Sequence, residues 1–226
     1  MTLTCIGVGP GDPELLTIKA VRLIEEADVI VVPVKKQAST ESTALKIAQP
    51  YIKDMSKVKY LYFPMVAFQK DDEQIQQIFR HNAQMINEDL GAGKKVVYLT
   101  LGDPSVYCTF TYIADYIDHV TYVPGIASFL QGAAHIGQPL CLGKESLAII
   151  NMTDDERTIR QAFQLHDNLV VMKVSANPKL LHELIVQDNR PATFLSNMGL
   201  ENEMVTSDRG FLEGKVPYFT VAQVKR

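Results

Sequence analysis

The sequence contains no tryptophan, only three cysteines among its 226 residues, and no apolar run of about 18 residues. Cys5, Cys108 and Cys141 are far apart in the chain and none belongs to a CxxC pair, which argues against a zinc site or a disulfide framework. We therefore expect buried, reduced thiols and no bound metal. Because the sequence also lacks a basic N-terminal region followed by an apolar core, we expect neither membrane insertion nor export, and the protein is predicted to be cytoplasmic.

An excess of positive charge is also absent. The chain has 22 lysine and arginine residues against 26 aspartate and glutamate residues, which gives a net charge of −4 at pH 7. This balance argues against a nucleic-acid partner. The five histidines are scattered, so no metal-binding or acid–base cluster is visible. A chain of this length can form one large domain or two smaller ones.

Short β-branched runs alternate with helical segments in the first half of the chain. Residues 71–90 form the clearest predicted helix, because apolar side chains recur every three or four positions and acidic ones gather at its start. Such an alternation of strands and helices predicts a mainly parallel sheet that is covered by helices. The strands are expected at residues 3–8, 29–34, 58–62, 96–101 and 120–123.

A second α/β series begins near Pro124. We therefore predict two α/β domains with mainly parallel sheets, residues 1–123 and residues 124–226. Near the C-terminus, residues 204–207 and 218–224 flank two glycines and are predicted to form an antiparallel pair. The other elements expected in this half are helices at 128–135, 155–165 and 178–187, and strands at 146–151, 169–174 and 192–195.

The loop Gly7-Val8-Gly9-Pro10-Gly11-Asp12 connects the first predicted strand to a helix, which is the setting of a dinucleotide-binding loop. Its spacing differs, because GxGxxG would need glycine where Asp12 stands. Asp12 and Pro13 are predicted to be the N-cap and first residue of the helix. The carboxylate of Asp12 then accepts hydrogen bonds from backbone amides that would otherwise bind a phosphate. Pro10 removes a further amide. Either the glycines only permit a tight turn, or the loop admits a neutral or cationic ligand. S-adenosylmethionine fits the second case, since it has no phosphate and carries a sulfonium charge.

Two further loops are predicted at the same edge of the sheet. The tripeptide Gly102-Asp103-Pro104 directly follows the strand at 96–101, and residues 123–128, with the sequence VPGIAS, join the two predicted domains. Ligands of parallel α/β sheets bind at the carboxyl ends of the strands. Each loop alone is a common turn or linker. The three loops together indicate a ligand site.

Four segments taken in order resemble the tetrapyrrole methylases, a family of S-adenosylmethionine-dependent methyltransferases. They are GVGPGDPELLTIKAVRLIEEADVIVVP, TLGDPSVYCTFTYI, YVPGIASF and NLVVMK, and the resemblance covers most of the chain. It implies two α/β domains with S-adenosylmethionine bound in the cleft between them, S-adenosylhomocysteine as the product, a tetrapyrrole substrate and a homodimer. The chain departs from the family's pattern at Ala127, where many relatives have threonine.

The resemblance also implies which residues contact the cofactor. The three loops contribute most of these residues, and two methionines of the second domain are implied to lie near the adenosine. For Met172, the alternative is a side chain that only packs in the hydrophobic core. The implied cofactor contacts are Pro10, Leu101, Gly102, Asp103, Val106, Ala127, Ser128, Met172 and Met198.

Candidate substrate contacts lie next to these loops. Tyr107 and Tyr112 follow the second loop and are candidates to orient the macrocycle, and Tyr107 is also the candidate to relay the proton that the methylated carbon must lose. The alternative for Tyr107 is an aromatic ring packed at the start of a helix. Lys35, Lys36 and Lys173 follow strands at the carboxyl edge and are candidates to bind substrate carboxylates, with a solvated lysine as the alternative for each.

Local sequence also indicates a branch of the family. Residues 100–110, TLGDPSVYCTF, and residues 62–65, YFPM, resemble the branch that methylates carbon 20 of precorrin-2 or cobalt-factor II. The resemblance therefore implies a C(20)-methyltransferase of cobalamin biosynthesis. The alternatives are a tetrapyrrole methylase that acts at another ring position, on uroporphyrinogen III or like diphthine synthase, and a non-catalytic nucleotide-binding protein.

Overall fold

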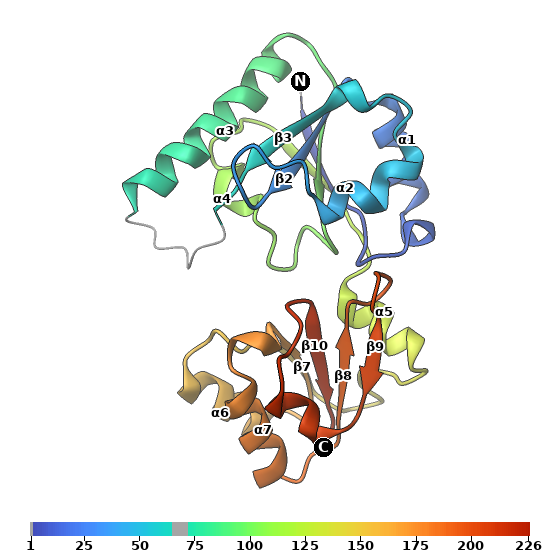
Figure 1. Cartoon of the computed structure of the whole chain (residues 1–226), viewed down its shortest axis with the longest axis vertical. Helices are drawn as coiled ribbons and strands as arrows, with labels where there is room; N and C mark the ends of the chain where they lie inside the picture. The colour runs from blue at the N-terminus through green and yellow to red at the C-terminus, as the bar shows by residue number, and fades with distance from the viewer. Residues whose placement is uncertain (1, 65–71) are drawn as a thin grey trace. The chain divides into compact units, whose positions relative to one another are not determined.

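The computed structural model describes residues 2–64 and 72–226 of the chain (Figure 1). Met65 and Asp71, which belong to the segments 62–65 and 71–90 considered above, lie outside the described residues. Contacts between residues divide the chain into two compact units, Met1–Ala127 and Ser128–Arg226. Each unit has its own sheet and its own hydrophobic core.

Within the described residues, the first unit is built on a five-stranded sheet in the order β3-β2-β4-β1-β5. Every pairing in this sheet is parallel, as predicted. The strand bounds are close to the predicted ranges because each strand is a short apolar run that ends at a turn. They are β1 (Leu3–Gly7), β2 (Val29–Val34), β3 (Val58–Tyr62), β4 (Val96–Thr100) and β5 (Val120–Val123).

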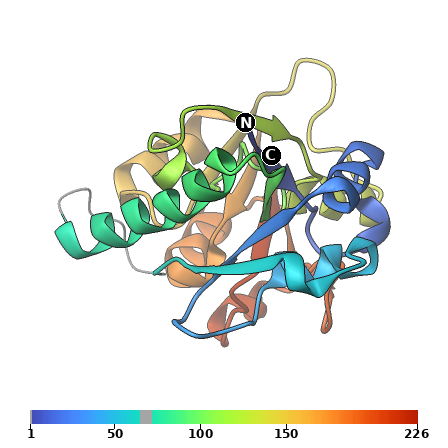
Figure 2. The same cartoon turned by 90° about the horizontal axis from the view of Figure 1, so that it is seen from above.

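Helices cover both faces of the first sheet. On one face, α3 and α4 pack around the buried side chains of Phe79, Ile86, Phe110 and Ile113, whereas α1 and α2 lie on the other face (Figure 1). In Figure 2, which is seen from above, the green helix α3 lies across the view so that its whole length is visible. The bounds are α1 (Ile18–Glu26), α2 (Thr43–Ala48), α3 (Glu73–Gly91) and α4 (Thr111–Ala114), with 3-10 turns η1 (Pro13–Leu15), η2 (Gln49–Tyr51) and η3 (Met55–Lys57).

The strand order makes β1 and β4 a topological switch point. These two strands are neighbours, but the chain leaves β1 towards β2 and leaves β4 towards β5, in opposite directions across the sheet. Right-handed crossovers then place the two connections on opposite faces, which opens a crevice at the carboxyl ends of the two strands. The loops that follow β1 and β4 are therefore placed where α/β sheets bind ligands.

The second unit has a mixed sheet in the order β6-β7-β10-β8-β9 within the described residues. The prediction of a mainly parallel sheet is wrong here, because only β6 and β7 are parallel, whereas β10 runs antiparallel to both β7 and β8, and β9 runs antiparallel to β8. The bounds are β6 (Leu147–Asn151), β7 (Asn168–Met172), β8 (Ala192–Ser196), β9 (Met204–Thr206) and β10 (Thr220–Val224).

The last two strands do not pair with each other, contrary to the prediction of an antiparallel pair. All five residues of β10 are buried, so this strand lies inside the sheet with a neighbour on each side. In contrast, Met204 and Val205 of β9 are exposed, and this short strand forms an edge. The last strand of the chain, buried on both of its faces, therefore lies between two earlier strands, β7 and β8.

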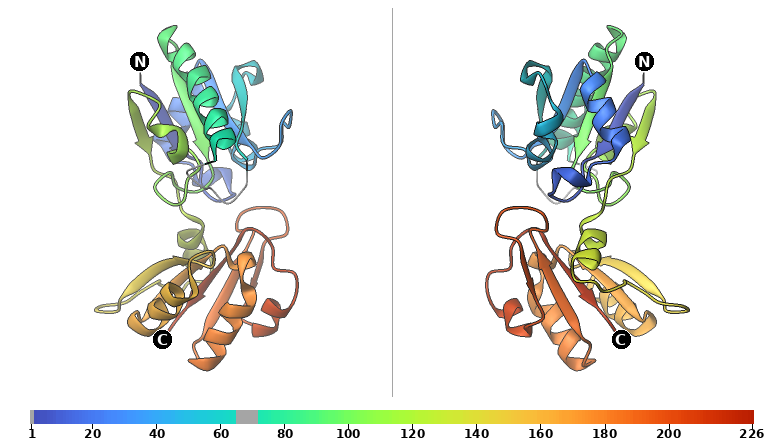
Figure 3. Two further views of the ribbon diagram at one scale, coloured as in Figure 1. Left: turned by 90° about the vertical axis from the view of Figure 1, so that its left-hand side faces the viewer. Right: turned by 90° about the vertical axis from the view of Figure 1, so that its right-hand side faces the viewer.

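Two layers of helices flank the second sheet. The helices α6 and α7 lie along one face (Figure 1 and Figure 3), and the core of the unit contains Phe163, Leu181 and Phe194. On the opposite face, Gln223 Nε2 of β10 donates a hydrogen bond of 3.3 Å to the carbonyl of Phe129 in α5. The bounds are α5 (Ser128–His135), α6 (Glu156–Leu165) and α7 (Pro178–Gln187), with 3-10 turns η4 (Val174–Ala176) and η5 (Arg209–Glu213). Over the described residues, no helix is long and apolar enough to cross a membrane.

A buried arginine joins three parts of the second unit. Arg190, only 4% exposed, donates from Nε to the carbonyl of Lys225 at 2.9 Å and from Nη1 to that of Phe163 at 3.0 Å. Its Nη2 donates to the carbonyls of His166, at 3.0 Å, and Asp167. Desolvation lowers the pKa of Arg190, but backbone oxygens solvate its charge in place of water.

Candidate functional site

The first two glycine loops are joined by a pair of backbone hydrogen bonds. The amide of Gly9 donates to the carbonyl of Gly102 at 3.2 Å, and the amide of Gly102 donates to the carbonyl of Gly9 at 2.8 Å. Both residues have positive φ, +78° and +69°, which glycine adopts without the strain that a side chain causes. The loops after β1 and β4 therefore form one structure at the switch point.

The third loop approaches the other two so closely that side chains are excluded. A Cβ atom on Gly125 would lie 2.2 Å from the carbonyl oxygen of Gly102, and one on Gly7 would lie 2.6 Å from the amide nitrogen of Gly125. Both distances are below 3.0 Å, and the atoms approached belong to the backbone, which has little freedom to move. Gly7 and Gly125 were not among the predicted site residues. Their position at a strand end in two of the three loops is the sequence feature that could have indicated them.

Asp103 ties the second loop to the third. Its Oδ2 accepts a hydrogen bond from the amide of Gly125 at 3.0 Å, and its Oδ1 accepts from the amide of Ser105 at 2.8 Å and from the Ser105 hydroxyl. Hydrogen bonds to an ionised carboxylate are stronger than those between neutral groups. Asp103 therefore holds the three-loop junction together, a role that the prediction of a cofactor contact did not include.

The predicted N-cap at Asp12 is confirmed, but the element that it caps is shorter than expected. Its side chain accepts from the amide of Glu14 at 2.8 Å, and Pro13 follows at the first position of the three-residue turn η1. The α-helix itself begins only at Ile18, where Thr17 is the cap. Pro10 is buried in the first loop. A carboxylate thus occupies the first helical turn after the glycines.

The remaining predicted residues of the first unit lie around this junction. Leu101 and Val106 are partly buried, Ala127 is buried at the end of the unit, and Tyr107 is 51% exposed with a φ of +49°. A left-handed backbone is rare for an aromatic residue and is found mainly at functional sites and turns. Tyr112 stacks on Phe79 of α3, with ring centroids 5.5 Å apart, and so lies on the α3 face of the sheet.

Lys35 and Lys36 are exposed and directly follow the carboxyl end of β2, the edge to which β1 and β4 bring the glycine loops. Desolvation lowers the pKa of Lys35, although the residue as a whole is exposed. The structure thus brings both lysines to the edge of the sheet that carries the loops.

Three of the predicted residues of the second unit, Met172, Lys173 and Met198, lie at one edge of its sheet. Met172 ends β7, partly buried, and Lys173 follows it, exposed and with a φ of +53°. Met198 is buried just after β8, which runs in the same direction as β7 because both are antiparallel to β10. Ser128, partly buried, opens α5.

A model of the tetrapyrrole (corrin/porphyrin) methylase family matches residues 2–212. The chain belongs to this family. This tetrapyrrole methylase is 30% identical to the cobalt-precorrin-2 C(20)-methyltransferase of Salmonella typhimurium over 99% of this chain and 96% of the relative. It is 27% identical to the precorrin-2 C(20)-methyltransferase of a Sinorhizobium species over 97% of this chain and 93% of the relative.

Solved structures show the same fold. The uroporphyrin-III C-methyltransferase of Thermus thermophilus, solved in complex with S-adenosylhomocysteine, superposes with a TM-score of 0.69, at 20% identity, over all of this chain and 98% of that one. The predicted α/β fold of the tetrapyrrole methylases is therefore confirmed.

Two thiols of this tetrapyrrole methylase meet beneath the second loop. Cys5 of β1 and Cys108 are buried close to each other, and the Cys108 thiol lies 3.2 Å from the hydroxyl of Thr100. The contact between the thiols, with burial, raises the pKa of Cys5, whereas it lowers the pKa of Cys108 to about 7. The prediction of buried thiols is wrong for Cys141, which is exposed. Among the described residues, no group of three or more His, Cys, Asp or Glu side chains could hold a metal ion.

Proposed function

We propose that this tetrapyrrole methylase transfers a methyl group from S-adenosylmethionine to carbon 20 of precorrin-2 or cobalt-factor II in cobalamin biosynthesis. The observation that carries the proposal is the nearly full-length similarity to relatives named for C(20) methylation, both with and without cobalt. The homodimer and the cytoplasmic location expected from the sequence are part of the same proposal.

The residues of the three-loop junction suit a cofactor without phosphate. Gly7 and Gly125 let the three loops pack backbone against backbone at the switch point, and the carboxylate of Asp12 opposes a second anion at the first turn. A sulfonium is attracted by the same arrangement. When bound, S-adenosylmethionine supplies the electrophilic methyl group, and the chain contributes in-line positioning and exclusion of water.

The substrate side requires a group that takes a proton and groups that bind carboxylates. The methylated carbon must lose a proton, and we assign Tyr107 to orient the macrocycle or move that proton, because it follows the second loop and has the left-handed backbone typical of functional sites and turns. Lys35, Lys36 and Lys173 are proposed to bind carboxylates, and Tyr112 to border the macrocycle beside Phe79.

The activity is tested by incubating the purified protein with S-adenosylmethionine and either precorrin-2 or cobalt-factor II. We expect the product to carry one new methyl group, which mass spectrometry detects and NMR places on carbon 20. The faster of the two substrates identifies the natural one. A methyl group at another carbon would refute the branch assignment, and tight binding of NAD without binding of S-adenosylhomocysteine would refute the whole proposal.

Replacing Asp103 by alanine is expected to weaken binding of S-adenosylhomocysteine by about tenfold, because the second and third loops lose their connecting carboxylate. The fold should persist, since the sheet pairings do not involve this side chain. Isothermal titration calorimetry measures the affinity. Asp118→Ala, at an exposed aspartate after α4, is the control and should bind like the wild type. Unchanged affinity in Asp103→Ala would place the cofactor elsewhere.

A further inference from the structure

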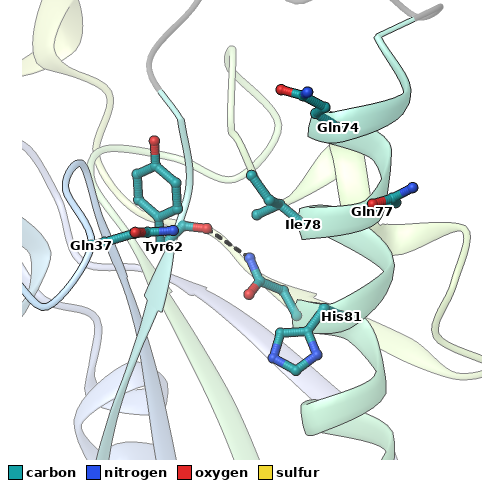
Figure 4. A pocket seen from close by; sticks show the side chains of 7 residues that line it. Gln37, Tyr62, Gln74, Gln77, Ile78 and His81 are labelled. Carbon is teal, nitrogen blue, oxygen red and sulfur yellow. Dashed lines mark hydrogen bonds between the residues drawn. The ribbon is translucent and has the colours of Figure 1, made fainter.

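A depression of about 420 Å³ lies at the carboxyl edge of the first sheet, on the side of β2 and β3 and outside the three-loop junction (Figure 4). It is formed by the loop after β2, the last residue of β3 and the first half of α3. Its polar lining consists of Gln37, Tyr62, Gln74, Gln77, His81 and Asn82.

A hydrogen bond from a buried asparagine holds the walls of this depression together. Asn82 of α3 is only 4% exposed, and its Nδ2 donates to the carbonyl of Tyr62 at 2.8 Å, the dashed line in Figure 4. This contact fixes α3 against the end of β3. The side chains of Gln74 and His81 extend from the same helix, about two turns apart, and Tyr62 stands opposite them (Figure 4).

Over the described part of the chain, the lining can donate many hydrogen bonds and contains no carboxylate. Three glutamine amides, a phenol and an imidazole are all donors. The acidic residues at the start of α3 are engaged elsewhere, because Asp72 accepts from the amides of Gln74 and Ile75, and Glu73 lies 3.5 Å from Arg80. Lys35 and Lys36 directly precede Gln37 in the same loop. The chemistry of the depression therefore favours a carboxylate ligand over a cation.

We propose that this depression binds a carboxylate side arm of the tetrapyrrole, an acetate or a propionate, and thereby sets the orientation of the macrocycle. The inference rests on the proposed function, since a reduced tetrapyrrole carries many carboxylates around an apolar ring. Neutral amides suit this task because they bind a carboxylate without the strong desolvation penalty of a buried lysine. Gln37 and Gln74 face the bound arm from the loop and from the helix.

The test introduces a negative charge into the depression. Gln37→Glu and Gln74→Glu should each weaken binding of cobalt-factor II by about tenfold or more, since a donor is replaced by a repelling carboxylate. Their affinity for S-adenosylhomocysteine should match that of the wild type. Gln74→Lys keeps a hydrogen-bond donor at this position and adds a positive charge. This variant should bind cobalt-factor II at least as tightly as the wild type.

Gln84→Glu is the matched control, because it makes the same change on an exposed part of the same helix outside the depression. It should leave both affinities unchanged. Wild-type affinity for cobalt-factor II in both Gln37→Glu and Gln74→Glu would overturn the inference and leave the proposed function standing. A wild-type protein that binds S-adenosylhomocysteine but neither cobalt-factor II nor precorrin-2 would overturn both.

Discussion

The Gly125→Ala variant is expected to lose affinity for S-adenosylhomocysteine by about a hundredfold or more. The added Cβ would lie 2.2 Å from the carbonyl oxygen of Gly102 and 2.7 Å from the carbonyl carbon and oxygen of Gly7. All of these atoms are backbone, and Gly102 is further held by its hydrogen bonds with Gly9. The three loops must therefore separate, which displaces every cofactor contact proposed for them.

Gly91→Ala is the matched control for this variant. Gly91 is the last residue of α3, its φ is not positive, and a Cβ there would meet no atom within 4 Å. Alanine is a better helix former than glycine, so this variant should be as stable as the wild type or more so, with the same affinity. Calorimetric titration of both variants with S-adenosylhomocysteine makes the comparison. Equal affinity for the Gly125→Ala variant and the control would show that the cofactor does not use the junction.

Replacing Arg190 by methionine is expected to lower the stability of the protein by about 3–5 kcal/mol. Methionine fills much of the space above the Phe163 ring, which lies 5.6 Å from the guanidinium carbon, but it can donate no hydrogen bond. The carbonyls of Phe163, His166, Asp167 and Lys225 lose their shared donor. Several buried acceptors without partners account for the size of the loss.

Thermal unfolding measures this effect, and a fall of about 10 °C in Tm corresponds to a loss of this size in a chain of this length. Hydrogen exchange should speed up first at the amides of β10, because the strand ends beside Lys225. Arg157→Met, at an exposed arginine of α6, is the control and should change Tm by less than about 2 °C. If Arg190→Met also changed Tm by less than about 2 °C, water would be shown to donate to these carbonyls in place of the guanidinium.

The local pattern of the sequence predicted the first unit well. Each strand from β1 to β5 is a short apolar run followed by a turn or a charge, so pattern and structure agree. The cap at Asp12 was equally predictable, since an N-cap depends on the residues directly next to it. Parallel strands then place the loops at one edge, which is why the position of the candidate site followed from the sequence.

Contacts between distant residues could not be predicted in the same way. Nothing in the local sequence shows that Gly9 bonds to Gly102, that Asp103 reaches Gly125, or that the thiols of Cys5 and Cys108 lie close together. The central place of β10 is a similar case, because its pairing is decided by burial against helices on both faces. Pairing partners of this kind depend on the whole fold.

The reciprocal hydrogen bonds between Gly9 and Gly102 have a consequence for recombination between relatives. Each loop supplies one donor and one acceptor, and each needs a left-handed glycine at the matching position. A chimera that takes one loop from a relative with different spacing would leave a backbone donor and a backbone acceptor of the other loop without these partners. Gly9 and Gly102 are 93 residues apart in the chain. The loops after β1 and β4 can therefore be exchanged between relatives only together, so that the two residues of this contact must be inherited as a pair.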